Sequence, residues 1–165
     1  MVLFRLILAL GLALWAAAAS AQSFEDLVRQ LPEGDFADRA KVVAAIAATG
    51  DDRALPVLDS LLEGELAELK SNDAIVLLRS VGRDDFATDA LTGEDYGEVP
   101  SRGASKIKVN NQLRSTIRAA IGTMTLKDPD PARRLSAAQA AFAAPDPAQA
   151  PALQAALAAE TDAKV

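Results

Sequence analysis

The chain contains no cysteine and no histidine among its 165 residues. These absences exclude disulfides, thiol nucleophiles, histidine-based catalytic triads and metal sites built from Cys or His ligands. Catalysis by carboxylate groups is still possible, but it would need a cluster of acidic residues that the sequence does not show. We therefore expect a protein that is not an enzyme and that uses no cofactor and no metal ion.

Aromatic residues are also scarce, with one Trp, one Tyr and five Phe. They are too few and too scattered to form a platform on which bases could stack. Acidic residues outnumber basic ones by 23 to 17, and the formal net charge is −6. An acidic chain repels nucleic acid and anionic lipid, so the composition argues against nucleic acid as a partner and favours another protein.

Long hydrophobic runs are lacking everywhere except at the N-terminus. There, Arg5 precedes an apolar run that begins at Leu6, and Ala19-Ser20-Ala21 matches a signal-peptidase site. We predict that residues 1–21 are a signal peptide and that the protein resides in the periplasm or on the extracytoplasmic face of the bacterial inner membrane. The run covers roughly 16 residues, whereas a spanning helix needs about 20; an uncleaved membrane anchor is the alternative.

Two segments of the chain, 35–62 and 130–157, align at a fixed offset of 95 residues (130 − 35). Their identities include Asp35 with Asp130 and Arg39 with Arg134, although several others are alanines in an alanine-rich chain. Self-similarity at a fixed offset is typical of stacked helical repeats. We therefore predict a mainly α fold of stacked helical repeats; an alanine-rich bundle whose helix caps coincide is the alternative. The motifs at 130–134 (Asp-Pro-Ala-Arg-Arg) and 146–153 resemble those of HEAT-like repeats, and this resemblance implies a HEAT-like helical-repeat solenoid.

Apolar residues at helical spacing, together with capping residues and helix-ending glycines, define the expected helices. They cover 24–31, 36–49, 52–63, a stretch from about 110, one from about 131, and 148–160. In the helix from about 131, the spacing predicts that Leu135, Ala138 and Phe142 face inward, and the last helix carries Leu153 and Leu157. Asn110 is a favoured N-cap residue for the helix that follows it.

The helical pattern stops between residues 65 and 109. The apolar run 74–78 indicates a strand, with a buried helix turn as the alternative, and 86–91 and 96–99 also have an extended pattern. Lys106 and Lys108 alternate with apolar residues, as in an edge strand protected by lysine. The expected organisation is a signal peptide (1–21), an N-terminal helical repeat (22–64), a β-containing insertion with a short β-hairpin (65–109) and a C-terminal helical repeat (110–165).

Four segments of the mature chain occur in an order that points to a family. These segments are 51–58, 89–94, 97–100 and 106–114. Together with the signal peptide, they resemble the N-terminal extracytoplasmic extension of bacterial urea ABC transporter permeases of the branched-chain amino-acid permease class. In that family a membrane domain follows, which this sequence lacks; the chain is then a fragment of a longer permease or a stand-alone relative.

Candidate partner-binding residues lie in two places. Asp89, Thr92 and Glu94 belong to an Asp-Ala-Leu-Thr-Gly-Glu segment, which is either a recognition turn or an ordinary hairpin turn containing glycine. The acidic residues around it could also hold Ca²⁺, but their spacing does not match an EF-hand loop, and a solvated acidic face is the simpler interpretation.

The second place is the start of the helix that begins near residue 110. Asn110, Asn111 and Arg114 lie within one helical turn, where amide and guanidinium groups could contact a partner loop or a small polar solute such as urea. The alternative is an N-cap beside an ordinary surface arginine.

The resemblance implies a non-catalytic periplasmic interaction domain associated with a urea ABC transporter permease. It would dock the urea-binding protein or the membrane subunits of the transporter, and the insertion is the expected contact surface. The alternative is a stand-alone periplasmic HEAT-like scaffold with an unrelated protein partner.

Overall fold

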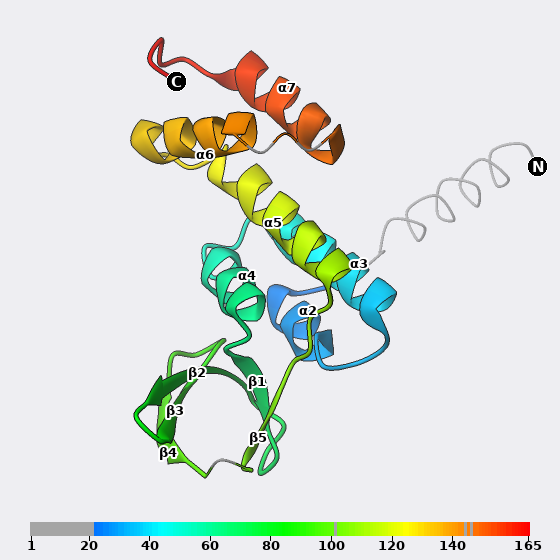
Figure 1. The fold of residues 1–165 in the computed structure, drawn as a ribbon, viewed down its shortest axis with the longest axis vertical. Helices are drawn as coiled ribbons and strands as arrows, with labels where there is room; N and C mark the ends of the chain where they lie inside the picture. Colours follow the sequence, from blue (N-terminus) through cyan, green and yellow to red (C-terminus); the bar gives the residue numbers. More distant parts are fainter. Residues whose placement is uncertain (1–21, 101, 144, 146) are drawn as a thin grey trace, which may run out of the picture.

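The computed structural model describes residues 22–100, 102–143, 145 and 147–165 (Figure 1). The predicted signal peptide lies outside these residues. Six helices and a five-stranded antiparallel sheet make up the described part of the chain. The expectation of a mainly α solenoid with a short hairpin is therefore wrong, because the middle segment builds a full sheet and the fold is mixed α/β.

Three helices precede the sheet: α2 (Phe24–Gln30), α3 (Phe36–Thr49) and α4 (Ala54–Glu63). The Ser23 and Asp35 side chains cap the first two by accepting backbone N–H groups of the first turn, as short polar side chains do at helix starts. Gly50 and Gly64 follow α3 and α4 in the left-handed conformation, with φ of 71° and 76°. Glycine adopts that conformation without a steric penalty, so it ends both helices sharply.

The sheet contains five short strands in the order β4-β3-β2-β1-β5. They are β1 (Leu66–Leu69), β2 (Ile75–Val81), β3 (Asp84–Asp89), β4 (Asp95–Val99) and β5 (Ala104–Lys106). The predicted strands at 74–78, 86–91 and 96–99 correspond to β2, β3 and β4, whereas β1 was not expected. Of the edge strand predicted around Lys106 and Lys108, only Lys106 belongs to β5, which pairs with β1, and Lys108 follows after the strand has ended.

The sheet is apolar on both faces, because its strands alternate between two clusters of buried side chains. Leu66 and Ile75 pack with the buried residues of α2, α3, α4 and α5 in the main core. Ala67, Leu69 and Val76 point the other way, into a second and smaller cluster. Figure 1 shows that the sheet curls strongly, with the helices lying above one end of the curl.

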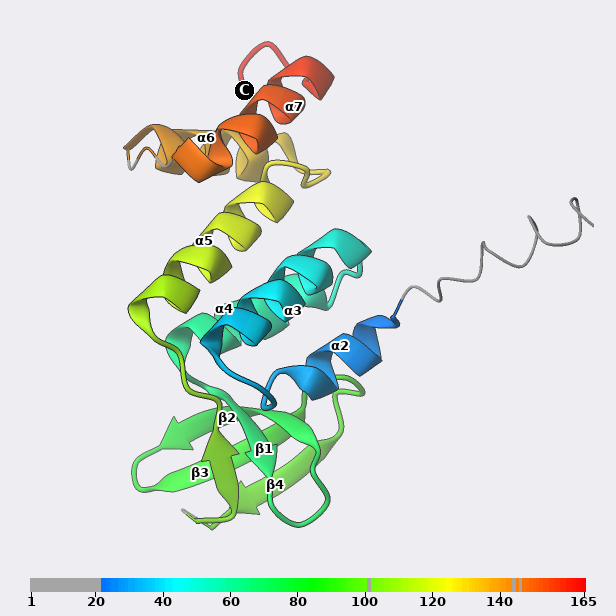
Figure 2. The same cartoon turned by 90° about the vertical axis from the view of Figure 1, so that its right-hand side faces the viewer.

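The chain returns from β5 to three further helices: α5 (Asn111–Thr125), α6 (Pro131–Ala143) and α7 (Ala150–Ala159), with a short 3₁₀ turn at Pro147–Gln149. α5 packs against α3 and α4 and buries Leu113 and Ile117 in the main core. α6 and α7 lie beyond the far end of α5, away from the sheet (Figure 2). None of the helices in the described part of the chain is long and apolar enough to cross a membrane.

The inward-facing residues predicted for the helix that became α6 are only partly correct. Leu135 and Ala138 are half-buried, whereas Phe142 is 88% exposed. On α7, Leu153 is half-buried and Leu157 is 79% exposed. Within the described residues, no helix or strand covers Phe142 or Leu157.

Candidate interaction site

The predicted site residues Asp89, Thr92 and Glu94 form the turn between β3 and β4. The Asp89 Oδ1 atom accepts the backbone N–H groups of Leu91 and Thr92, both at 2.8 Å. The Asp89 backbone N–H donates to the Glu94 carbonyl at 2.8 Å. Gly93 has a φ of 75°, which the turn requires and glycine provides. The segment is therefore a hairpin turn with a defined hydrogen-bonded shape.

The Asp89 carboxylate is engaged on both of its oxygens. Its Oδ2 atom accepts the Tyr96 hydroxyl at 3.3 Å. Burial raises the pKa of Asp89, but the hydrogen bonds from the Thr92 and Leu91 amides and from the Thr92 and Tyr96 side chains outweigh it and hold the pKa below its usual range. Asp89 thus stays ionised at neutral pH and shapes the turn, leaving the exposed Thr92 and Glu94 side chains to face solvent.

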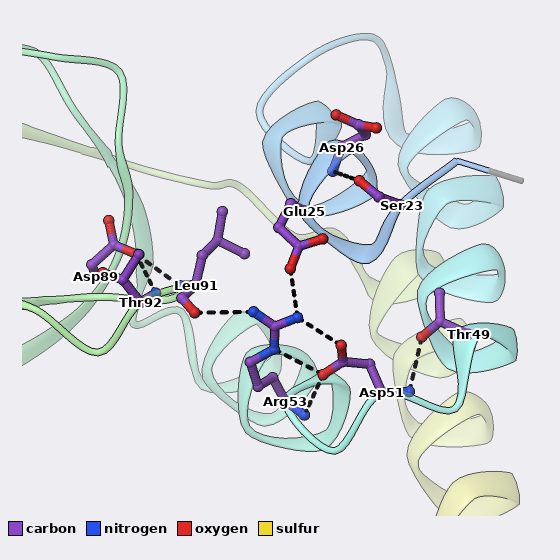
Figure 3. A network of polar contacts seen from close by, with 9 residues as sticks. All are labelled: Ser23, Glu25, Asp26, Thr49, Asp51, Arg53, Asp89, Leu91 and Thr92. Atoms are coloured by element: carbon purple, nitrogen blue, oxygen red, sulfur yellow. Dashed lines mark hydrogen bonds and ion pairs between the residues drawn. The ribbon is translucent and has the colours of Figure 1, made fainter. Parts of the chain in front are cut away.

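Arg53 ties this turn to the helical part of the molecule (Figure 3). Its Nη1 atom donates to the Leu91 carbonyl at 3.1 Å. Its Nη2 atom donates to Glu25 at 2.6 Å and to Asp51 at 2.7 Å, and its guanidinium lies 4.6 Å from the centre of the Phe24 ring. One side chain therefore contacts α2, the α3–α4 connection and the β3–β4 turn.

The ion pairs around Arg53 shift the pKa values of its partners. Hydrogen bonding to the guanidinium lowers the pKa of Glu25 and that of Asp51, and the same bonds raise the pKa of Arg53. All three groups are charged at neutral pH. The network is partly open to solvent, with 41% of the Arg53 side chain exposed, and it works as a structural clamp for the turn.

Sequence reasoning missed this clamp. The spacing predicted a third helix over 52–63, whereas α4 begins at Ala54 with Arg53 at the N-cap position and no side-chain cap. Asp51 accepts the backbone N–H and the guanidinium of Arg53. The short spacing of Asp51 and Arg53 was a usable signal, but nothing local in the sequence connects Arg53 with Glu25, 28 residues away.

The second group of predicted site residues lies at the start of α5. The Asn110 Oδ1 atom accepts the Leu113 backbone N–H at 2.8 Å, so Asn110 is the N-cap. The Arg114 Nη1 atom donates to the Leu62 carbonyl at 2.8 Å, which satisfies a carbonyl in the last turn of α4 that has no intrahelical partner. Asn111 is exposed.

The structure does not bring the two groups into one hydrogen-bonded site. Within the described residues, no hydrogen bond joins Asp89, Thr92 or Glu94 to the α5 group. Four of the six predicted residues, Asp89, Thr92, Asn110 and Arg114, make side-chain contacts within the fold; the Thr92 hydroxyl accepts the Glu94 backbone N–H at 3.3 Å although Thr92 is exposed. The other two, Glu94 and Asn111, present exposed side chains.

Grooves on the surface lie among the helices, away from the predicted residues. One of about 530 Å³ lies between the α3–α4 connection and the end of α5, and none of the six predicted residues lines it. In the portion of the chain that the structure describes, no group of three or more acidic residues is arranged to hold a metal ion. The arrangement therefore offers an exposed turn on a rigid support as its most distinctive surface feature.

Comparisons of this chain with protein-family models, with curated proteins and with solved structures found no match.

Proposed function

We propose that this chain is a non-catalytic periplasmic interaction domain associated with a urea ABC transporter permease, and that its β3–β4 turn docks the urea-binding protein or the permease body. The resemblance of segments 51–58, 89–94, 97–100 and 106–114 supports the transporter context. The geometry of the turn supports the docking role and narrows the contact surface from the whole insertion to one loop.

The observation that carries this proposal is the clamp on an exposed turn. The backbone of the turn is fixed by Asp89 from within and by Arg53 from the helical side. Thr92 and Glu94 nevertheless face solvent. A loop that is already held in one conformation loses little conformational entropy when a partner binds it, and loops held on a rigid scaffold commonly carry binding residues.

The chemistry of the turn defines the partner surface that it fits. Glu94 and Asp95 are adjacent, exposed and acidic. The Thr92 hydroxyl beside them is exposed but already accepts the Glu94 backbone N–H at 3.3 Å. The complementary surface presents Lys or Arg side chains or backbone N–H groups. Charge complementarity of this kind speeds association and selects the partner more than it raises affinity.

Two of the segments that carry the resemblance meet at this turn. Arg53 belongs to segment 51–58, and Leu91, whose carbonyl it binds, belongs to segment 89–94. The residues quoted for the resemblance thus cooperate in holding one loop, which supports treating them as a functional unit.

The test uses binding of the chain to the purified urea-binding protein and to detergent-solubilised transporter membrane subunits, measured by surface plasmon resonance. We expect Glu94→Lys to weaken the interaction by about tenfold or more. The matched control is Glu33→Lys, which reverses an exposed acid in the α2–α3 connection. Wild-type chain that binds neither probe, or equal losses in both variants, would contradict the proposal.

A further inference from the structure

The expected mature chain begins close to the residues that clamp the β3–β4 turn. The predicted peptidase site Ala19-Ser20-Ala21 places the cut directly after it, so that Gln22 becomes the first residue. Phe24 and Glu25 follow two and three positions later, and both contact the Arg53 guanidinium. The loss of a few residues from the mature end would therefore remove part of the clamp.

The residues that follow the predicted cut lie outside the folded core. Gln22 and Ser23 precede α2 and are exposed. Ser23 has an extended backbone, with φ of −66° and ψ of 157°. Phe24, the first residue of α2, is only 5% exposed and belongs to the main core. Exposed chain ends of this kind are accessible to proteases, so both the cut and any later trimming would act on this segment.

A glutamine at the first position can react with its own α-amino group. Such a group titrates not far above neutral pH, so that a fraction of it is unprotonated and nucleophilic. Its nitrogen forms a bond with Cδ of the Gln22 side chain and closes a lactam ring of the size of the proline ring. The Cδ–Nε2 bond breaks, and Nε2 leaves as ammonia with the proton that the α-amino group gives up. The product is pyroglutamate, which is uncharged, and the reaction needs no other reactant.

The surroundings of Gln22 allow this reaction without a change in the fold. Within the described residues, no hydrogen bond engages the Gln22 side chain, so it is free to turn toward the α-amino group. The cap of α2 uses the Ser23 hydroxyl and carbonyl, which accept the amides of Asp26 and Leu27, and ring closure changes neither. Gln22 lines a groove of about 330 Å³ between α2 and α3, where Leu27 and Val42 offer apolar contacts to an uncharged ring.

We propose that Gln22 of the exported chain is converted to pyroglutamate and that this blocked end protects the Arg53 clamp from aminopeptidases. An aminopeptidase recognises the free α-amino group of its substrate, and pyroglutamate has none. The inference rests on the export that the proposed function includes, because only the cut after Ala21 makes Gln22 a chain end. It adds a covalent modification that neither the docking turn nor the transporter assignment requires.

The test is expression of the whole sequence in a bacterium, followed by the intact mass of the chain recovered from the periplasmic and membrane fractions. We expect a chain of residues 22–165 that is lighter than its unmodified sequence by about 17 Da, the mass of one ammonia. Gln22→Ala keeps the predicted peptidase site but cannot cyclise, so it should show the unmodified mass. Gln112→Ala, at an exposed glutamine on α5, is the matched control and should keep the loss of ammonia.

The possible masses separate this inference from the prediction on which it rests. A chain of full length, or one with another first residue, would overturn both the modification and the predicted cleavage. A wild-type chain that begins at Gln22 with a free α-amino group would overturn the modification alone and leave the periplasmic location standing.

A second measurement tests the protection of the clamp. The wild-type, Gln22→Ala and Gln112→Ala chains are incubated with an aminopeptidase of broad specificity, and their masses are followed. We expect only Gln22→Ala to lose residues from its N-terminus. Hydrogen exchange at the amides of Leu91 and Thr92 should then become faster in the trimmed variant alone, because the clamp has lost its contacts on α2. Equal behaviour of the wild type and Gln22→Ala, or a trimmed variant whose turn exchanges at the wild-type rate, would overturn the protective role.

Discussion

Two regions of the molecule, α2 to α5 and the C-terminal helix pair α6 and α7, use similar local signals but differ in how many side chains they bury. In both, an aspartate caps a helix, Asp35 for α3 and Asp130 for α6. In both, an arginine on that helix binds carbonyl groups of the preceding loop, Arg39 in the first and Arg134 in the second. Only the first region buries large side chains. Local signals therefore place the helices in both regions, and we expect the burial of apolar side chains to stabilise the first region more.

The first prediction tests the difference in burial at a pair of leucines, where we expect the largest effect. Leu58 is fully buried in the main core, so Leu58→Ala should lower the free energy of unfolding by about 2–5 kcal/mol. Leu157→Ala removes the same atoms from an exposed position and should change it by about 0.5 kcal/mol or less. Urea unfolding followed by circular dichroism at low chain concentration measures both values, and equal losses would mean that the C-terminal pair is packed after all.

The second prediction concerns the clamp between helices and sheet. Arg53→Met keeps the aliphatic part of the side chain but removes its bonds to Glu25, Asp51 and the Leu91 carbonyl. We expect a lower unfolding midpoint, smaller in effect than Leu58→Ala, and faster hydrogen exchange at the amides of Leu91 and Thr92. Arg29→Met, at an exposed position on α2, is the control. Unchanged exchange in the turn would show that Asp89 alone holds it.

The helices were largely predictable because their signals are local. Asn110 caps the helix that the sequence assigned to it, and Ser23 and Asp35 cap α2 and α3 in the same local way. Helix periodicity located α2, α3, α4 and α5 to within a few residues. Each of these features depends on side chains within about four residues of one another, which is the range over which capping and helical spacing act.

The sheet was only partly predictable because strand pairing is not local. β1 consists of Leu66-Ala67-Glu68-Leu69, residue types that favour helix. It becomes a strand because Gly64 ends α4 and because β2 and β5 pair with it on either side. The same limit applies to the candidate site, where Arg53 and Leu91 lie 38 residues apart, and to Phe142, whose exposure depends on what the rest of the chain leaves uncovered.

The third prediction separates a structural from a partner-binding role for Asn110. Because its side chain accepts the Leu113 amide, Asn110→Ala should lower the free energy of unfolding by about 1 kcal/mol. Asn110→Asp or Asn110→Ser should restore most of that loss, since each can also cap a helix. Asn111→Ala, at the neighbouring exposed position, is the control. A loss of partner binding in Asn110→Ala without a loss of stability would assign Asn110 to recognition instead.

The last prediction concerns the smallest and most local effect, the pH dependence of the ion pair between Arg134 and Glu160. Arg134 holds Glu160 with bonds of 2.7 and 2.8 Å, and these lower the pKa of Glu160 from 4.5 to about 2. Because the folded pKa is depressed, the stabilisation is complete above about pH 4.5 and is lost as the pH falls toward 2. Both side chains join α6 to the segment after α7, so the loss should appear there first.

This effect is measured by hydrogen exchange of the α6 and α7 amides between pH 6 and 2. The rates are corrected for the intrinsic pH dependence of exchange. We expect the opening free energy of these amides to fall with pH before that of α5. Glu160→Gln should show the weakened opening free energy already at pH 6 and a smaller further fall. Acid also affects Glu25 and Asp51, whose pKa values are lowered by Arg53, so α5 reports the general loss of stability. Wild-type and Glu160→Gln chains could both show the same pH profile of opening free energy for α5 as for α6 and α7. The two regions would then unfold as one unit, and the difference in burial between them would have no counterpart in stability.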